Sequence, residues 1–365
     1  MIANDIAKAG TSIWLDDLSR AKLSGTDSLS LPSRIKNSGV VGVTTNPSIF
    51  NSAITGSADY AADISLMKSQ SPEEIVKKLT TDDVRQACDL FSKIYADSKG
   101  VDGRVSIEVD PRLAHETQET INEGKSLWAL VDRPNLMIKV PATLAGLPAI
   151  TELIASGISV NVTLIFSCQR YEQVIDAFIS GIEEATKRGN DVSQIHSVAS
   201  FFISRIDTAV DKELKTINSS ESLGLLGQAA IANAVLAYEL FLNKSSSARW
   251  TKLIDAGAHM QRPLWASTGV KDPSYDDTRY VMELIAPNTV NTMPQSTLDA
   301  VIDHGKFHGN TITPAIENSH DVINQLAQVG ILLDSITDTL EVDGVAAFSK
   351  AWQSLLDDVD KVRRA

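Results

Sequence analysis

A short apolar stretch of the sequence contains one lysine. The stretch reads NLMIKVPAT, from Asn135 to Thr143, with Lys139 at its centre. Lysine is rarely buried unless its charge is paired or its amine is held neutral, because burial disfavours the charged form. A neutral amine is a nucleophile that forms a Schiff base with a carbonyl compound. The alternative is a lysine at a strand edge that extends its ammonium group to solvent.

Schiff-base chemistry also needs groups that move protons, and two carboxylates are placed to do so. Asp16 lies near the end of TSIWLDD, and Glu108 lies near the end of RVSIEVD. One would assist the loss of water during imine formation, and the other would accept a proton from a substrate hydroxyl. The alternatives are a surface charge for Glu108 and a helix cap for Asp16 or Asp17, of which Asp17 is the favoured cap.

Hydroxyl and amide side chains recur at the ends of the other strand-like runs. In the alternating pattern of a strand they share a face with neighbours of the same kind. Together they would bind the hydroxyl groups of a polyol. Each also has a structural alternative: Asn46 precedes Pro47 and fits a helix N-cap, and Thr163 and Ser267 fit hydroxyls of the core. The candidates are Thr44, Asn46, Asn161, Thr163, Ser200, Phe202 and Ser267.

Two cationic side chains follow the sixth and seventh strand-like runs. Arg205 and Lys271 could bind a phosphate group, and the alternative for both is a solvated surface charge. His304 and His308 are four residues apart but Gly305 lies between them, and the sequence offers no third ligand. We therefore predict no metal site.

The elements that would position these residues alternate between short strands and longer helices. Such alternation predicts a parallel sheet built from right-handed βαβ units, and eight units predict a closed TIM-type (β/α)₈ barrel. A doubly wound open sheet is the alternative, but no GxGxxG turn follows IWLDD. In a barrel the candidate residues converge at the carboxyl-terminal ends of the strands, where such folds place their active sites. The predicted strands begin at Thr11, Val40, Arg104, Asn135, Ile158, His196, Arg262 and Arg279, where the last reads RYVMELIA.

The C-terminal part differs because it reads as helices only. We predict one domain over residues 1–365, with the barrel at 11–295 and a helical extension at 296–365 packed on it. The last helix is amphipathic, and it could alternatively pair two subunits or dock a partner. Its apolar residues at helical spacing are Val345, Phe348, Trp352, Leu355, Leu356 and Val359.

Composition narrows the class of protein. The chain has 365 residues and a net charge of −13, which disfavours broad binding to nucleic acid or to an anionic membrane. There are two cysteines and no CxxC pair. No signal peptide and no membrane-spanning run is evident, so we expect a cytoplasmic protein. The oligomeric state is expected to be a monomer or a homodimer.

Five strand-end motifs together resemble the transaldolase family. In order they are GVTTNPSIF, SIEVDPRLAHET, NLMIKVPAT, GISVNVTLIFS and SVASFFISRID, and LWASTGVKDPSYDDTRYV resembles the longer bacterial branch. The resemblance extends from Ser12 to Met293. It implies a class I aldolase-type barrel that needs no metal or organic cofactor, because the imine acts as the electron sink.

The resemblance also implies roles for individual residues. Lys139 matches the Schiff-base lysine, Asp16 the aspartate that deprotonates the donor's C4 hydroxyl, Glu108 the glutamate that acts through a water, and Thr163 the threonine that orients this water. Asn46 and Asn161 match asparagines that bind the dihydroxyacetone portion. Ser200 and Phe202 match the sixth-strand serine and aromatic residue, and Arg205 and Ser267 match phosphate ligands. A second family arginine is absent from STGVKDP, where Lys271 is the nearest cation.

The implied reaction transfers a dihydroxyacetone unit between phosphorylated sugars in the non-oxidative pentose phosphate pathway. The donor would be sedoheptulose 7-phosphate or fructose 6-phosphate, and the acceptor an aldose phosphate. One alternative is a fructose 6-phosphate aldolase-type enzyme that releases dihydroxyacetone to water. Another is a phosphosugar-binding barrel without catalysis, for which a buried lysine would serve no purpose.

Overall fold

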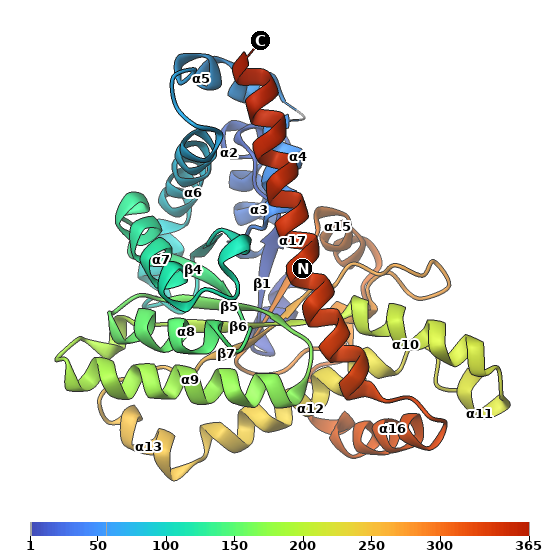
Figure 1. Cartoon of the computed structure of the whole chain (residues 1–365). Helices are drawn as coiled ribbons and strands as arrows, with labels where there is room; N and C mark the ends of the chain where they lie inside the picture. Colours follow the sequence, from blue (N-terminus) through green and yellow to red (C-terminus); the bar gives the residue numbers. More distant parts are fainter. Residues whose placement is uncertain (1, 56, 365) are drawn as a thin grey trace.

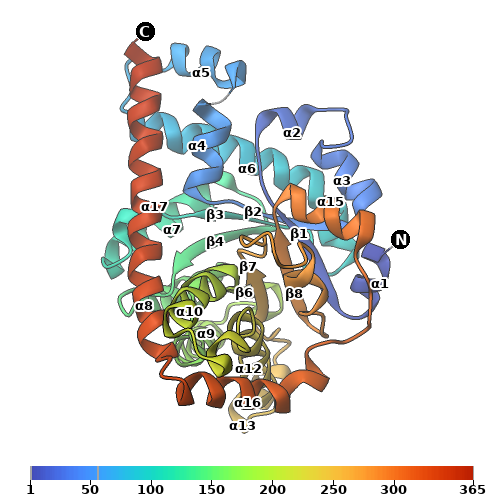
Figure 2. The ribbon, with the colours of Figure 1, turned by 90° about the vertical axis from the view of Figure 1, so that its right-hand side faces the viewer.

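The chain folds into a closed barrel of eight parallel strands surrounded by helices (Figures 1 and 2). The computed structural model describes residues 2–55 and 57–364. Each strand pairs with its neighbours in chain order, and β1 pairs with β8 to close the barrel. The predicted fold class is therefore confirmed. The strands are β1 (Thr11–Asp16), β2 (Val40–Thr44), β3 (Arg104–Glu108), β4 (Leu136–Pro141), β5 (Val160–Ile165), β6 (Ser197–Phe202), β7 (Arg262–Ala266) and β8 (Thr289–Met293).

Helices separate the strands and cover the outside of the barrel. The longer ones are α3 (Leu31–Ser38), α4 (Pro47–Thr55), α6 (Pro72–Asp97), α7 (Thr117–Val131), α8 (Gly146–Ala155), α9 (Cys168–Lys187), α10 (Ser204–Ile217), α12 (Ala229–Ser245), α15 (Gln295–His304), α16 (Ile316–Gln328) and α17 (Leu333–Arg364). The shorter ones are α1 (Ile2–Lys8), α2 (Arg20–Ser24), α5 (Ala61–Leu66), α11 (Ser220–Leu223), α13 (Ala248–Ile254) and α14 (Arg279–Met282). Short 3₁₀ turns are η1 (Ala58–Tyr60), η2 (Pro111–Leu113), η3 (Val192–Gln194) and η4 (Thr313–Ala315).

The predicted eighth strand is wrong. Its segment begins with the helix α14, and the strand that closes the barrel is β8, a few residues further on. An apolar run as short as RYVMELIA does not distinguish a strand from a buried helix. The segment TVNTM of β8 is rich in β-branched residues, which favour a strand. The first seven predicted strands each overlap a strand of the barrel.

The predicted cap at Asp17 is also wrong. Ser19 caps α2, since its hydroxyl accepts a hydrogen bond from the backbone N–H of Lys22 at 3.3 Å. Asp17 instead forms an ion pair with the ammonium group of Lys22.

The lower interior of the barrel is filled and closed by side chains. Trp14 stands against Gly42, where an added Cβ would lie 2.6 Å from the indole ring. The indole N–H of Trp14 donates to Asp102 at 3.2 Å, and Arg262 forms an ion pair with the same carboxylate at 3.0 Å. Glycine at position 42 is therefore required by the close approach of the ring. This packing fills the barrel interior beside β1 and β2, below the carboxyl-terminal end at which such folds place their active sites.

The last helix, α17, lies across the carboxyl-terminal end of the barrel (Figures 1 and 2). It has 32 residues, which corresponds to a length of about 48 Å. It packs against α4, α6 and α10, and Arg170 holds it through an ion pair with Glu341 at 3.0 Å. At Gly344 it approaches β5 so closely that an added Cβ would lie 3.0 Å from Leu164. The helix is therefore part of the wall above the strands.

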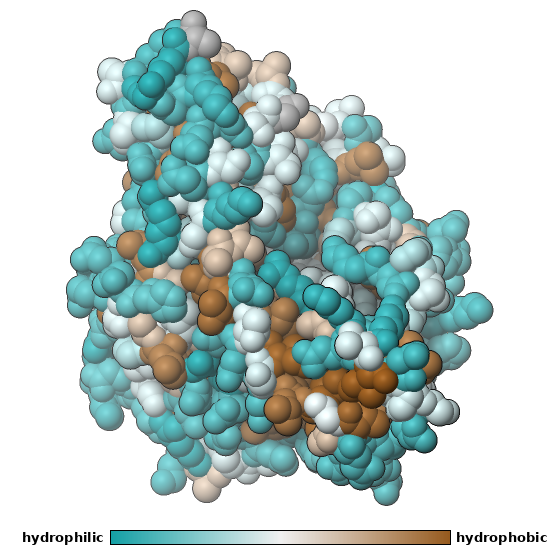
Figure 3. All heavy atoms as spheres, turned by 45° about the vertical axis from the view of Figure 1, so that its right-hand side comes forward, coloured by the Kyte–Doolittle hydropathy of each residue, from teal (hydrophilic) through white to brown (hydrophobic). Residues whose placement is uncertain are grey.

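Most of the face in Figure 3 is hydrophilic, with one hydrophobic area in its lower part. Within residues 2–55 and 57–364, no helix is long and apolar enough to cross a membrane.

Candidate active site

Lys139 is buried at the mouth of the barrel, on β4. Only 5% of its side chain is exposed, and its Nζ donates a hydrogen bond to the carbonyl oxygen of Thr45 at 3.0 Å. The same Nζ lies 3.4 Å from a carboxylate oxygen of Glu108 and 5.5 Å from the ring centre of Phe348. A lysine that snorkels to solvent is excluded by this burial. The register explains the contacts, because Lys139 pairs with Glu108 on β3 and with Asn161 on β5.

Glu108 has few partners for a buried carboxylate. Only 4% of its side chain is exposed, and neither oxygen makes a hydrogen bond with a described residue. Its one charged neighbour at ion-pair distance among the described residues is Lys139, at 3.4 Å. Burial raises the pKa of Glu108 to about 7, and the charge of Lys139 opposes this rise. A carboxyl group with a pKa near neutrality can both give and take protons at physiological pH.

Asp16, at the end of β1, accepts a hydrogen bond from one hydroxyl group, that of Thr44. The Thr44 hydroxyl donates to Asp16 at 2.7 Å and also lies 2.7 Å from the hydroxyl oxygen of Thr292 on β8. Burial raises the pKa of Asp16, and both the charge of Lys139 and the hydrogen bond from Thr44 oppose this rise. Asp16 thus has a fixed orientation and lines a cavity.

A chain of hydrogen bonds links β3, β5 and β6. The Ser200 hydroxyl donates to the side-chain oxygen of Asn161 at 2.7 Å, and the Asn161 amide donates to the Ser106 hydroxyl at 3.0 Å. These bonds fix the Asn161 side chain beside Lys139. Thr163, two residues after Asn161 on β5, is fully buried, and its hydroxyl has no partner among the described residues.

Two cations lie on the opposite side of the mouth. Arg205, at the start of α10, lies 5.3 Å from the ring centre of Phe202, and burial lowers its pKa. Lys271 is exposed. No carboxylate among the described residues lies within ion-pair distance of either. Ser267 has the left-handed backbone angle φ 56°, and its hydroxyl oxygen lies 3.0 Å from that of Ser204.

Most of these side chains surround one cavity of about 200 Å³ at the mouth of the barrel, which we call the mouth cavity. The predicted residues that line it are Asp16, Thr44, Asn46, Lys139, Ser200, Phe202, Arg205, Ser267 and Lys271. Glu108, Asn161 and Thr163 lie beside Lys139 or along β5 but do not line the cavity. Asn46 lines the cavity and also fits the helix-cap alternative, because its side chain accepts a hydrogen bond from the N–H of Ile49 at 3.0 Å and so caps α4.

Sequence reasoning missed other residues that line the mouth cavity. They are Ser48, Ala266, Gly269, Thr292, Pro294 and Phe348. Thr292 was missed because the eighth strand was misplaced, although the β-branched pattern of TVNTM was available. Phe348 appeared only as an apolar residue of the last helix, and no local pattern indicates where that helix lies.

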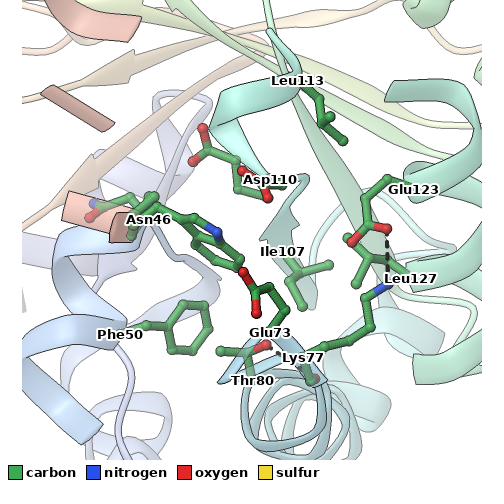
Figure 4. Close-up of a pocket in the computed structure, with 13 residues that line it drawn as sticks. Asn46, Phe50, Glu73, Lys77, Thr80, Ile107, Asp110, Leu113, Glu123 and Leu127 are labelled. Carbon is green, nitrogen blue, oxygen red and sulfur yellow. Dashed lines mark hydrogen bonds and ion pairs between the residues drawn. The ribbon is translucent and has the colours of Figure 1, made fainter. Parts of the chain in front are cut away.

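A second cavity of 160 Å³ adjoins the first (Figure 4). We call it the side chamber. Asn46 borders both cavities, whereas Glu108 and Trp352 line only the side chamber. The rest of its lining is Pro47, Phe50, Glu73, Lys77, Thr80, Ile107, Asp110, Leu113, Glu123 and Leu127.

Fold and site together define a (β/α)₈ barrel with a buried lysine between two carboxylates and a cationic region on one side of the mouth. The chain belongs to the transaldolase/fructose-6-phosphate aldolase family, whose model matches residues 13–359. A transaldolase of Mycolicibacterium smegmatis is 54% identical over 354 residues, covering 96% of this chain and 95% of that protein. A transaldolase of Renibacterium salmoninarum is 54% identical over 358 residues, covering 98% and 95%. One of Thermobifida fusca is 52% identical over 356 residues, covering 97% and 96%.

Proposed function

We propose that the chain is a transaldolase, a transferase of the pentose phosphate pathway, in which Lys139 forms the covalent bond to the donor. The observation that carries this proposal is the burial of Lys139 between Glu108 and the mouth cavity. Family membership and relatives that are 52–54% identical over nearly their full length support the transferase activity. The substrates are phosphorylated sugars.

In the first half of the reaction, the Lys139 amine attacks the C2 carbonyl of the ketose phosphate. The resulting carbinolamine loses its hydroxyl as water, with the proton supplied through Glu108, whose pKa of about 7 suits both directions of transfer. Thr163 orients the water. The product is an imine between Nζ and C2 of the donor.

In the second half, Asp16 takes the proton from the C4 hydroxyl and the C3–C4 bond breaks. The electron pair of this bond moves into the imine, which becomes an enamine, and an aldose phosphate leaves. The enamine then attacks the aldehyde of the acceptor, and hydrolysis of the new imine restores Lys139. Asn46, Asn161 and Ser200 bind the dihydroxyacetone portion, with Thr44 orienting Asp16 and Phe202 packing beside Arg205.

The phosphate group binds where Arg205, Ser267 and Lys271 meet. Arg205 and Lys271 both line the mouth cavity, which supports a phosphate bound there at the end of the sugar remote from C2. Lys271 supplies a point charge in place of the bidentate fork of an arginine.

We further assign residues 296–365 to the same domain as the barrel, because α17 packs on α4, α6 and α10 and its Phe348 lines the mouth cavity. The two cysteines, Cys88 and Cys168, are free thiols, which supports a reducing, cytoplasmic location. Light scattering of the purified chain will test the expected monomer or homodimer.

A second candidate function is a fructose 6-phosphate aldolase, since the matched family includes that activity. A transaldolase needs an aldose phosphate acceptor, whereas an aldolase releases dihydroxyacetone without one. With fructose 6-phosphate as donor, we expect glyceraldehyde 3-phosphate to form rapidly only when erythrose 4-phosphate is present. Equal rates with and without the acceptor, together with free dihydroxyacetone, would identify an aldolase instead.

A further inference from the structure

The side chamber reaches Glu108 from the outside of the barrel. Its inner end is formed by Asn46, Ile107 and Glu108, at the ends of β2 and β3. Its outer end lies between α6 and α7, where the side chains of Glu73 and Lys77 are 52% and 34% exposed. Figure 4 shows Lys77 reaching across to Glu123, with which it forms an ion pair at 2.9 Å. The chamber thus extends from a buried carboxylate to the surface.

The helix α17 separates the side chamber from the mouth cavity. Phe348 lines the mouth cavity only, and Trp352 lines the side chamber only. These residues are four positions apart, so they project from the same face of the helix. The ring centre of Phe348 lies 5.5 Å from Nζ of Lys139. One helix therefore covers the lysine and divides the space above the strands in two.

Polar groups with no partner among the described residues border the side chamber. They are both carboxylate oxygens of Glu108 and the indole N–H of Trp352, all buried. A buried polar atom without a partner is costly, so such atoms normally bind water. The volume of 160 Å³ accommodates several water molecules, each of which occupies about 30 Å³ in the liquid. The chamber therefore offers room for water next to residues whose buried polar atoms have no partner among the described residues.

We propose that the side chamber is a water passage that connects Glu108 and the imine carbon with bulk solvent while a sugar fills the mouth cavity. The inference rests on the proposed function. The ketone and the Lys139 amine condense to an imine and one water, which carries away the C2 oxygen. The reverse step adds one water and restores the ketone and the amine. The passage lets the released water exchange with solvent between these two steps.

Oxygen-18 exchange at C2 measures this passage directly. Fructose 6-phosphate is incubated with enzyme in H₂¹⁸O without acceptor, and mass spectrometry follows ¹⁸O at C2. When water exchanges before the imine is hydrolysed, each cycle inserts ¹⁸O. When it is trapped, the original oxygen returns to the ketone. Transfer to an acceptor consumes no net water and therefore gives the reference rate. The Lys139→Ala variant gives the background of spontaneous exchange.

Thr80 is a suitable position for blocking the chamber. It is 3% exposed, lines the chamber, and its hydroxyl donates to the carbonyl oxygen of Val76 in its own helix at 2.9 Å. Thr80→Phe places a phenyl ring in the passage. Thr80→Val is the matched control, because it removes the hydroxyl without adding volume. Leu127→Phe blocks the chamber from α7 and replaces Thr80→Phe if that variant melts at a much lower temperature than the wild type.

We expect the ratio of ¹⁸O exchange to transfer to be the same in wild type and Thr80→Val. In the blocked variant it should fall about tenfold, equivalent to an added barrier of ~1.4 kcal/mol for water exchange. An unchanged ratio in a folded blocked variant would overturn the passage. Failure of the proposed function has a different result: the wild type itself would show neither transfer nor exchange above the Lys139→Ala background.

Discussion

The two carboxylates beside Lys139 have opposite surroundings. Asp16 accepts a hydrogen bond from Thr44 at 2.7 Å and faces the mouth cavity. Glu108 makes no hydrogen bond with a described residue, forms an ion pair with Lys139 at 3.4 Å, and faces the side chamber. One carboxylate is therefore fixed against the substrate, and the other is placed where water can reach it.

This difference assigns the two proton transfers to separate sides of the lysine. When two titratable groups have different environments, each can serve a different step. On the mouth side, a fixed base can select one hydroxyl of the sugar. On the chamber side, a carboxyl with a pKa of about 7 can exchange protons with water. Variants of Asp16 and of Glu108 should therefore slow different steps of the reaction.

Removing the lysine should affect both sides at once. Lys139→Met keeps the length of the side chain but removes the amine, so transfer should fall by a factor on the order of 10⁵, as for other covalent nucleophiles. Steady-state kinetics measures the loss, and circular dichroism checks the fold. Transfer within tenfold of the wild-type rate would contradict the assignment of Lys139.

On the mouth side, Asp16→Asn should slow bond cleavage by about 10³-fold without preventing imine formation. The amide keeps the hydrogen bond to Thr44 but cannot accept the C4 proton. Stopped-flow and borohydride trapping separate the two steps. Loss of imine formation in this variant as well would contradict the assignment of Asp16 and Glu108 to different steps.

The burial of Glu108 should make the stability of the protein depend on pH. The pKa of Glu108 is raised from 4.5 to about 7, so the folded state binds more protons than the unfolded state between these values. The contribution of Glu108 to stability is therefore largest below pH 4.5 and falls as pH rises to 7. Relative to the wild type, Glu108→Gln should gain up to ~3 kcal/mol across this window.

Denaturant unfolding at several pH values measures this gain. Glu74 offers a control, because it is exposed and its pKa is lowered by hydrogen bonds from Ser71. Glu74→Gln should show no gain as pH rises. A difference between Glu108→Gln and wild type that stayed constant across the window would mean that folding does not raise the pKa of Glu108.

On the chamber side, Glu108→Gln should slow imine formation by about 10²-fold. Cleavage of an imine already formed should be nearly unchanged, which is the reverse of the Asp16→Asn pattern. Single-turnover measurement of the borohydride-trappable species gives the rate. If imine formation kept its normal rate, the proton for the loss of water would have to come from another group.

The smallest effects are expected at the phosphate end. Arg205→Ala should raise KM for fructose 6-phosphate by more than Lys271→Ala, which should raise it about tenfold, because exposed charges contribute less. Activity with unphosphorylated fructose should be unchanged in both variants. Equal losses for fructose and its phosphate would show that neither cation binds the phosphate.

The strands and most of the mouth could be predicted from sequence because their patterns are local. Strand alternation places Asp16, Glu108 and Lys139 at one end of a parallel barrel, and the structure brings them together. The prediction of the eighth strand was wrong because a short apolar run is compatible with both helix and strand. Thr292, which contacts Thr44, was therefore not predicted as a site residue.

The path of α17 could not be predicted in the same way. Helical spacing indicates that Phe348 and Trp352 share an apolar face, but it does not say what the face covers. That depends on contacts far apart in the chain, such as the ion pair between Arg170 and Glu341 and the close approach at Gly344. The separation of the two cavities therefore depends on long-range contacts of α17 that no local pattern indicates.

The central claim is that Lys139 forms the covalent bond to the donor. Sodium borohydride added to the enzyme with fructose 6-phosphate should reduce the imine to a stable amine, and peptide mapping by mass spectrometry then locates it. We predict one adduct, on Lys139, in the wild type and in Asp16→Asn. An adduct on a different lysine, or no adduct in the active wild-type enzyme, would contradict the account.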